Sequence, residues 1–518
     1  MPPKLTAAEI EANDAARLNE LGYKQELKRE LSSFGNYGLA LSVVCISSGL
    51  TSLFLYGLNT GGPVVMVWGW VIVAVFTMTV ALSMAEISSA YPTSGGLYWW
   101  AARLSSKRYA PFTSWMTGWF NLIGQFAVTA GINYGIALMV AATIYVGTNG
   151  AWTPTVGATV GIHIAMCVTH GIANSLGPKV MTGINSFSTW WQVIAPAVIM
   201  ITIVAKAPTH QSAKFVFTHF NNNSGWASPA YVAVVGLLQA QFTLTGFDSS
   251  AHMSEETKNA EISGPVVSAI MGFLFIIAFL FSIQDFEATV GSATGFPVMQ
   301  IIYDCVGHAG AIVLMVMLII ACWQCGFASV AANSRMIYAF SRDNAMPGTL
   351  PALGNSTAFS AITSVATIGL YISYAVPIFA KLINKKQFHR GPLHLGRFSE
   401  IINIISIFWI CLITILFVLP PVYPIEAVSM NYACLAVGLV FFGAGGAFLI
   451  DARKWFTGPV INLSKNELEH TQLEKDRQNI SGDLENSSNT EKPQVPSTAS
   501  DIKIKEDKVQ VSEVENAS

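Results

Sequence analysis

The sequence contains few charged residues. Only 11% of its 518 residues are Asp, Glu, Lys or Arg, whereas 52% are hydrophobic and the mean hydropathy is +0.49. An ordinary soluble domain carries about 25% charged residues. So little charge cannot keep a globular surface hydrated, which excludes soluble enzymes, nucleic-acid-binding proteins and disordered scaffolds. The composition predicts an all-α, polytopic membrane protein whose surroundings are the lipid bilayer.

Cysteine and catalytic motifs are also scarce. Seven cysteines in the chain make no disulfide framework, and the Cys322-x-x-Cys325 pair lies in an apolar stretch where helix packing is favoured over a redox or metal role. His163 and His170 share one helical face but lack a third ligand. No HExxH, nucleophile elbow or glycine-rich phosphate loop occurs. We therefore expect no enzyme, catalytic residue, metal or cofactor, and no nucleic-acid partner.

Long apolar runs dominate the middle of the chain. Crossing a bilayer takes about 20 helical residues. Eleven segments qualify, the third and eighth long enough to tilt or project into water. They lie near residues 40–58, 63–85, 115–146, 156–175, 185–205, 231–250, 265–284, 310–340, 358–380, 401–420 and 432–450.

The apolar runs define three parts of the chain. Residues 1–36 are polar and lack a signal-peptide core, so we expect a cytosolic N-terminal segment. Residues 37–456 form the predicted transmembrane domain, and residues 457–518 have the composition of a disordered cytosolic tail. The protein is thus expected in the plasma membrane or an organelle membrane.

Basic residues support a cytosolic N-terminus for the first eight spans. Those in the expected cytosolic connections are Arg103, Lys107, Arg108, Lys179, Lys258 and Arg342, and only Lys206 and Lys214 fall outside. Beyond span eight the rule fails, because eleven spans would put the basic loop 381–397 and the tail outside. One more crossing would correct both violations, yet the linker 341–356 is short and contains two prolines. A helix is therefore predicted to be missing here.

Two spans contain polar, glycine-bearing interruptions. Span one holds Ser47, Ser48, Gly49, Leu50 and Thr51 near its middle; its counterpart in span six includes Thr243, Thr245, Gly246, Phe247 and Asp248. Interrupted first and sixth spans are typical of five-plus-five inverted-repeat transporters, whose broken helices expose backbone amides and carbonyls at the bilayer midplane. Free amides suit a carboxylate and free carbonyls suit an ammonium group or a cation. Close helix packing is the alternative interpretation.

Few polar side chains lie within the spans, and two interpretations are open for the role of each. Asp248 either caps the second half of span six or contacts a substrate amine. Asn121 and Gln125 form a polar stripe on span three, which either lines a hydrated path or bonds to another helix. We include Gln125 among the candidate substrate-binding residues. Asn222-Asn223-Ser224 is a glycosylation sequon in a loop expected outside.

Five stretches resemble one transporter family. They are Leu18–Leu27, Glu86–Tyr98, Trp115–Asn121, Ala251–Thr257 and Ser364–Tyr374. Together they closely resemble the 4-aminobutyrate and choline permease group of the amino acid, polyamine and organocation transporter superfamily. The resemblance implies twelve spans in the leucine-transporter fold, substrate between broken spans one and six, and proton-coupled uptake. It also implies a loop and a ninth span between Met346 and Leu353 that this chain lacks.

The leading functional hypothesis is a permease that imports amino acids or related amines such as 4-aminobutyrate, by alternating access and with a proton as the coupling ion. Two alternatives stay open: a transporter-like nutrient receptor, and a truncated form that does not transport.

Overall fold

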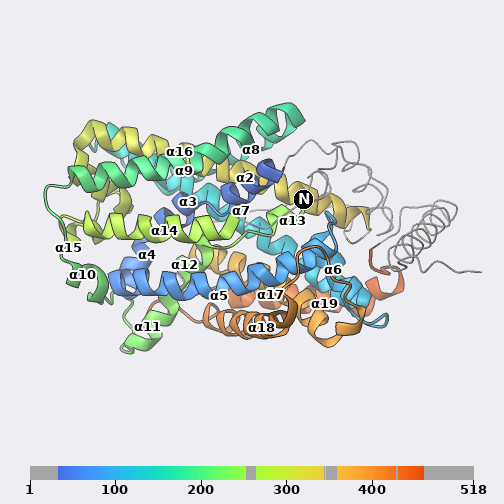
Figure 1. Ribbon diagram of the computed structural model, residues 1–518. Helices are drawn as coiled ribbons and strands as arrows, with labels where there is room; N and C mark the ends of the chain where they lie inside the picture. The colour runs from blue at the N-terminus through green and yellow to red at the C-terminus, as the bar shows by residue number, and fades with distance from the viewer. Residues whose placement is uncertain (1–32, 253–263, 344, 346–358, 427–429, 460–518) are drawn as a thin grey trace, which may run out of the picture. The chain divides into compact units, whose positions relative to one another are not determined.

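The computed structural model describes residues 33–252, 264–343, 345, 359–426 and 430–459, so most of the predicted terminal segments lie outside the described residues. The described chain is helical and has one isolated β-bridge, between Thr60 and Asn222. The long helices are α5 (Gly62–Ala90), α7 (Ala110–Gly147), α8 (Val156–Ser175), α9 (Pro178–Lys206), α14 (Gly264–Phe281), α16 (Pro297–Arg342), α17 (Phe359–Ile383), α18 (Ser399–Leu416) and α19 (Ala433–Ile450) (Figure 1). The shorter helices are α2 (Ser33–Val43), α3 (Ile46–Ser52), α4 (Phe54–Asn59), α6 (Gly96–Leu104), α10 (Ala213–Thr218), α11 (Pro229–Gly236), α12 (Leu238–Thr243), α13 (Ser249–His252) and α15 (Phe286–Val290), and three 3₁₀ turns are η3 (Lys385–Gln387), η4 (Gly396–Phe398) and η5 (Ala452–Lys454).

The all-helical membrane architecture predicted from the sequence is confirmed. Eight helices of the described residues are long and apolar enough to span a bilayer, and two shorter apolar helices cover Tyr37–Ser52 and Val266–Phe281. The third span, α7, is a helix of 38 residues, whereas α16 bends at Gly307, whose φ is 73°, so the predicted eighth span corresponds to the part of α16 that follows this kink. Span six is divided among α11, α12 and α13, because the helix pauses at Leu237 and stops again at the polar interruption between α12 and α13.

Local signals explain where several helices begin. α9 starts with Pro178 directly after Gly177, whose φ of 94° is easily adopted only by glycine. Ser228 and Thr155 cap α11 and α8 by accepting hydrogen bonds from the backbone amides of Tyr231 and Ala158. These capping residues determine where the apolar helices begin.

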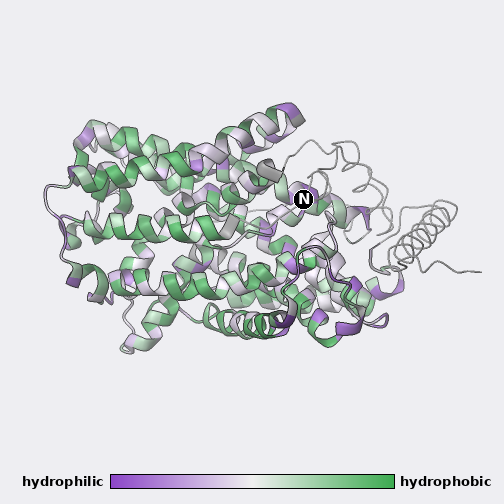
Figure 2. Cartoon of the chain, in the orientation of Figure 1, coloured by the Kyte–Doolittle hydropathy of each residue, from purple (hydrophilic) through white to green (hydrophobic). Residues whose placement is uncertain are grey.

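The outer helices present large apolar side chains instead of charges. Hydrophobic residues cover the lengths of the helices and hydrophilic ones concentrate near their ends (Figure 2). Phe442 of α19 is 77% exposed and Ile201 of α9 is 69% exposed. Monomeric soluble proteins rarely expose apolar patches this continuous, so lipid is the medium that covers them.

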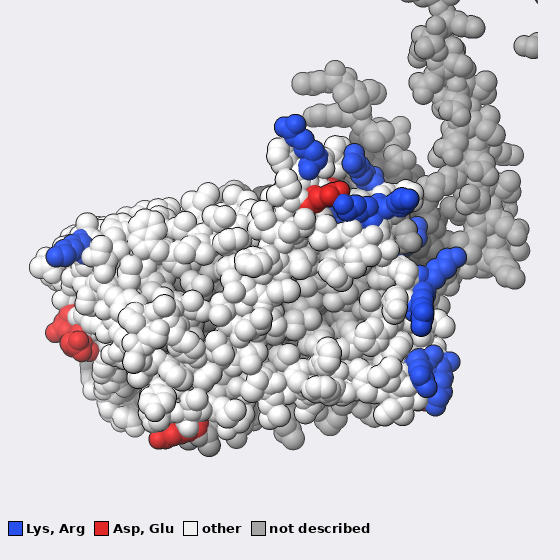
Figure 3. All heavy atoms as spheres, turned by 90° about the horizontal axis from the view of Figure 1, so that it is seen from below, with Lys and Arg blue, Asp and Glu red and all other residues white. Residues whose placement is uncertain are grey.

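Lysine and arginine gather at one end of the helical bundle (Figure 3). Contacts identify this end: Asn384 donates to the Leu104 carbonyl at 2.8 Å, and Trp115 packs on Trp455 with ring centroids 5.8 Å apart. The ends of α6, α17 and α19 and the start of α7 therefore meet. We call this the basic end. It brings together Arg103, Lys107, Arg108, Lys385, Lys386, Arg390, Arg453 and Lys454.

The connection between α16 and α17 joins opposite ends of the bundle. α16 finishes at the basic end, where the Tyr98 hydroxyl donates to the Asp343 carboxylate at 2.9 Å. α17 also finishes there, because Lys381 pairs with Glu86. Its 25 residues span about 37 Å, so its start lies at the far end.

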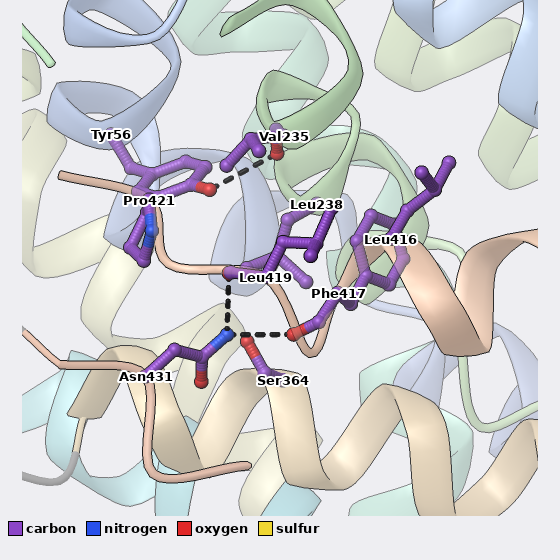
Figure 4. A pocket seen from close by; sticks show the side chains of 9 residues that line it. All are labelled: Tyr56, Val235, Leu238, Ser364, Leu416, Phe417, Leu419, Pro421 and Asn431. Carbon is purple, nitrogen blue, oxygen red and sulfur yellow. Dashed lines mark hydrogen bonds between the residues drawn. The ribbon is translucent and has the colours of Figure 1, made fainter. Parts of the chain in front are cut away.

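A small cavity at that far end confirms the direction of α17. Ser364, near the start of α17, lines it together with Tyr56 of α4 and Asn431 (Figure 4). The Asn431 amide donates to the carbonyls of Phe417 and Leu419 at 2.7 and 3.1 Å, which ties the loop after α18 to this end. Helices α17 to α19 thus keep the basic loop 381–397 at the basic end, and the crossing that the sequence predicts to be missing falls between α16 and α17.

A buried ion pair fastens α17 to α5 at the basic end. Lys381 Nζ lies 2.5 Å from Glu86 Oε2, with both side chains at most 6% exposed. The Ser399 hydroxyl and the Leu395 amide also donate to Glu86, at 2.6 and 3.2 Å. The Lys381 ammonium additionally lies 4.5 Å from the centre of the Phe388 ring. Removing one partner of such a pair leaves an uncompensated buried charge.

We expect Lys381→Ala to destabilise the protein by about 3–5 kcal/mol, since the Glu86 carboxylate loses its counter-charge. The check is the loss of monodisperse detergent-solubilised protein on heating. Lys385→Ala is the matched control, because its pair with Glu400 is more than half exposed and worth about 0–1 kcal/mol. Equal thermal stability of the two variants would contradict the assignment.

Candidate functional site

The interruption in span one lies between α2 and α3. Cys45 is the N-cap of α3, and its carbonyl accepts from the amides of Ser48 and Gly49, both at 3.2 Å. The amides without an intrahelical acceptor are therefore those of Ile46 and Ser47, the first two of the helix. The polar run in the sequence predicts free amides at Ser48, Gly49 and Leu50. In the structure the free amides lie just before these residues, at Ile46 and Ser47. The physical reason is that the helix resumes at Ile46, ahead of the polar run.

The interruption in span six covers residues 244–248, between α12 and α13. Gly246 has a φ of +95°, a left-handed conformation that turns the chain without a Cβ penalty. The hydroxyls of Thr243 and Thr245 donate to the carbonyls of Gln239 and Gln241, at 2.7 and 2.6 Å. Their own carbonyls accept from no donor among the described residues. Free backbone carbonyls, which suit the ammonium group of a substrate, are thus available in the interruption of span six.

The two interrupted spans touch each other. A Cβ built on Gly49 would lie 2.7 Å from the Thr243 Cα, so α3 and α12 approach as closely as two backbones can. The space between them is a cavity of about 10 Å³, lined by Val43, Cys45, Ser48, Gly49, Val128, Ile132, Phe242, Thr243, Thr245 and Cys325. That volume holds about one water molecule. The structure therefore has the two interruptions closed on each other.

Asp248 forms the centre of a buried polar cluster. Its side chain is fully buried, and its Oδ2 accepts from Gln125 Nε2 at 2.8 Å and Asn121 Nδ2 at 3.1 Å. Tyr374 donates its hydroxyl to Oδ1 at 2.8 Å. No backbone amide of the described residues donates to this carboxylate, so the N-cap interpretation is wrong in this structure. Helices α7 and α17 supply the donors instead.

The remaining candidate residues of span one are buried in α3. Thr51 donates its hydroxyl to the Ser47 carbonyl, and Leu50 is fully buried. Ser47 is also buried, and its hydroxyl has no partner among the described residues. In span six, Phe247 packs on Tyr374 with ring centroids 5.2 Å apart. The structure thus brings the candidates of both spans and Gln125 into one region, but their roles stay predictions.

Tyr374 and His252 are the cluster members that the sequence reading did not single out as site residues. Both fall in stretches that carry the family resemblance, at Ser364–Tyr374 and Ala251–Thr257. His252 is four residues after Asp248, a spacing that puts two side chains on one helical face. That spacing could have assigned His252 to the Asp248 cluster from the sequence alone. The position of Tyr374 next to Asp248 depends on tertiary contacts, so the sequence does not show it.

Comparison with known proteins now decides the family. A sequence profile described as amino acid permease matches residues 31–350 and 348–442. The chain belongs to the amino acid permease family. The match divides at residues 348–350, inside the linker where the sequence predicts a missing helix. The resemblance stated from the sequence is confirmed for the superfamily, and a transporter rather than an enzyme follows.

Plant and fungal permeases resemble this chain over most of its length. An amino-acid permease BAT1 homolog of Oryza sativa is 40% identical over 514 residues, covering 89% of this chain and 99% of the relative. Amino-acid permease BAT1 of Arabidopsis thaliana is 38% identical, with 86% and 96% covered. An amino-acid permease of Schizosaccharomyces pombe is 32% identical, with 88% and 92% covered. Amino acid transport is therefore the coarse function of this permease.

The sequon Asn222-Asn223-Ser224 lies at the end opposite the basic end. The Asn223 amide donates to the Asn59 carbonyl at the end of α4, at 3.0 Å, and Asn222 is exposed. We expect Asn222 to carry an N-linked glycan in a eukaryotic host, because the positive-inside rule predicts a cytosolic basic end and so places this loop on the other side. A glycosidase-sensitive mass shift that disappears in Asn222→Gln checks this. A shift that survives the substitution would contradict it and point to one of the other sequons, which begin at Asn355, Asn462, Asn479, Asn486 and Asn516.

Proposed function

We propose that this permease is a secondary active transporter that imports amino acids or related amines such as 4-aminobutyrate, with the basic end in the cytosol and a proton as the coupling ion. The observation that carries the proposal is the contact between two interrupted spans, with free amides on one side and free carbonyls on the other. A zwitterion needs both. Its carboxylate would meet the amides of Ile46 and Ser47, and its amine the carbonyls of residues 243–245.

Alternating access accounts for the closed cavity. Because a cavity of about 10 Å³ cannot hold an amino acid, binding must follow a separation of α3 from α12 toward one side of the membrane. Helices α7 and α17 flank the interruption of span six and hold Asp248 between them. Movement of the interrupted spans against these two helices is the expected opening.

An uptake panel tests the proposal. Proteoliposomes containing the purified chain are offered radiolabelled 4-aminobutyrate, choline, alanine, glutamate, arginine and putrescine under an inward proton gradient. We expect one or more amino acids to accumulate, and accumulation to fall when the pH gradient is collapsed. Uptake that follows external sodium and ignores the pH gradient would refute proton coupling. Binding of an amino acid without flux would support the nutrient-receptor alternative.

A further inference from the structure

Asp248 and His252 form a buried acid–base pair in span six. His252 Nε2 lies 3.4 Å from Asp248 Oδ2, and the two residues are 1% and 0% exposed. Buried ionisable side chains are costly in the membrane interior and are retained there mainly for function. The pair is therefore a candidate for a role that the substrate contacts above do not explain.

The surroundings of Asp248 are rich in hydrogen-bond donors. Gln125, Asn121 and Tyr374 all contribute hydrogen-bond donors to its two oxygens. Hydrogen bonds to an ionised acceptor are about twice as strong as neutral ones. Among the described residues, no lysine or arginine forms an ion pair with this carboxylate. Asp248 is thus a carboxyl group surrounded by hydrogen-bond donors, and His252 is its basic neighbour among the described residues.

Both ring nitrogens of His252 face groups that only accept. Nδ1 lies 3.3 Å from the Ser94 carbonyl oxygen, and Nε2, which has no hydrogen-bond partner among the described residues, lies 3.4 Å from the Asp248 carboxylate. A neutral imidazole has one N–H, whereas the imidazolium has two. Only the protonated ring can donate to both neighbours and neutralise the negative charge. There is thus a place for one additional proton on the His252 ring. Without that proton, one of the two ring nitrogens has no hydrogen to donate to its neighbour.

The packed elements carry few other titratable groups. α7 presents Asn121 and Gln125, which do not titrate, and the phenol of Tyr374 is already a donor to Asp248. Tyr371 packs on Tyr374 with ring centroids 5.2 Å apart. Toward the basic end, the same elements carry Tyr37 of α2, Tyr98 and Arg103 of α6, Arg335, Tyr338 and Arg342 of α16 with the neighbouring Asp343, and Lys381 of α17.

The pair lies between the interruption of span six and the basic end. Asp248 is the last residue of the interruption, and Ser94 belongs to the turn that joins α5 to α6 at the basic end. A proton on His252 is therefore placed between the expected substrate position and the expected cytosolic side.

We propose that Asp248 and His252 are the binding site of the coupling proton, which His252 takes from water on one side together with the substrate and returns to water on the other. This assignment rests on the proposed function, because it specifies where the coupling ion of that transport cycle binds. His252 acts on the proton and does not contact the amino acid.

The test measures how substrate affinity depends on pH. The purified full-length protein is titrated with radiolabelled 4-aminobutyrate, alanine, glutamate and arginine, and Kd is measured between about pH 5.5 and 8. In this range the carboxylate and the ammonium group of 4-aminobutyrate both keep their charge. One proton bound with the substrate makes Kd fall by up to about tenfold per pH unit on acidification. We expect His252→Gln to reduce this dependence to less than twofold over the whole range.

His170→Gln is the matched control. His170 is another fully buried histidine, on α8 against Trp323, and we expect its variant to keep the wild-type pH dependence. A His252→Gln protein that keeps that dependence overturns the assignment, as does a wild type that binds with pH-independent affinity. If His252→Gln does not fold, His252→Asn is measured in the same way. A wild type that binds none of the four probes refutes the proposed function itself, and the assignment falls with it.

Discussion

Insertion of one further span between Met346 and Leu353 is expected to raise uptake by at least tenfold. The insert comprises about 35 residues, a helix of about 20 with flanking loops. Only thirteen residues, 346–358, separate Ala345 from the start of α17, and the two attachment points lie at opposite ends of the bundle. A fully extended chain of that length covers about 46 Å, barely more than the thickness to be crossed.

The physical cost explains the expected gain. Backbone groups without partners in hydrocarbon cost several kcal/mol each, and native folds are stable by only about 5–15 kcal/mol. The alternative, inverting α17 to α19, would carry the basic loop across the bilayer and break the Glu86–Lys381 pair. Either outcome reduces the amount of functional protein, so the present chain should be impaired.

Surface abundance and uptake of the two forms decide the matter. A polar Gly/Ser insert of the same length at the same site is the control, because it relieves the length constraint without supplying a spanning helix. Equal abundance and uptake for the present chain and the helix-bearing form would show that the connection is tolerated.

Substituting Gly49 is expected to weaken substrate binding by at least about 100-fold, or about 2.7 kcal/mol. In Gly49→Val the new Cβ would lie 2.7 Å from the Thr243 Cα, so the added side chain fills the space between the interruptions that the substrate is expected to occupy. Any displacement of the helix start also moves the amides of Ile46 and Ser47 away from the expected carboxylate position.

Gly161→Val provides the comparison. Gly161 lies on α8 with no atom within 4 Å of its added Cβ, and the change costs less than about 1 kcal/mol in a helix. Binding of the same radiolabelled amino acid to both purified variants is the measurement. Unchanged affinity in Gly49→Val would place the substrate elsewhere.

The sequence predicts some features of this permease well because they depend on local patterns. Apolar runs locate the spans, and the polar residues 243–248 mark the interruption of span six. The sequence places the interruption of span one at residues 47–51, a few residues after the break seen in the structure. The exact boundary depends on the backbone geometry at Cys45, the N-cap of α3.

Long-range partners could not be predicted from these patterns. Tyr374 is 126 residues from Asp248 along the chain, and Lys381 is 295 residues from Glu86. Local sequence indicates that each of these side chains is unusual for a membrane segment, but it does not say which helices bring them together. That Asn121 and Gln125 donate to Asp248 is therefore seen only in the tertiary contacts, and the functional roles of these side chains stay predictions.

The close contact between the interrupted spans also has a consequence for the membrane itself. Cells store energy as ion gradients, and a continuous polar file through a permease would dissipate them. With Gly49 against Thr243 and room for about one water molecule, the polar groups at the interruptions are separated from bulk solvent. We therefore expect the close contact at Gly49 to limit the leak of ions through the permease in an energised membrane.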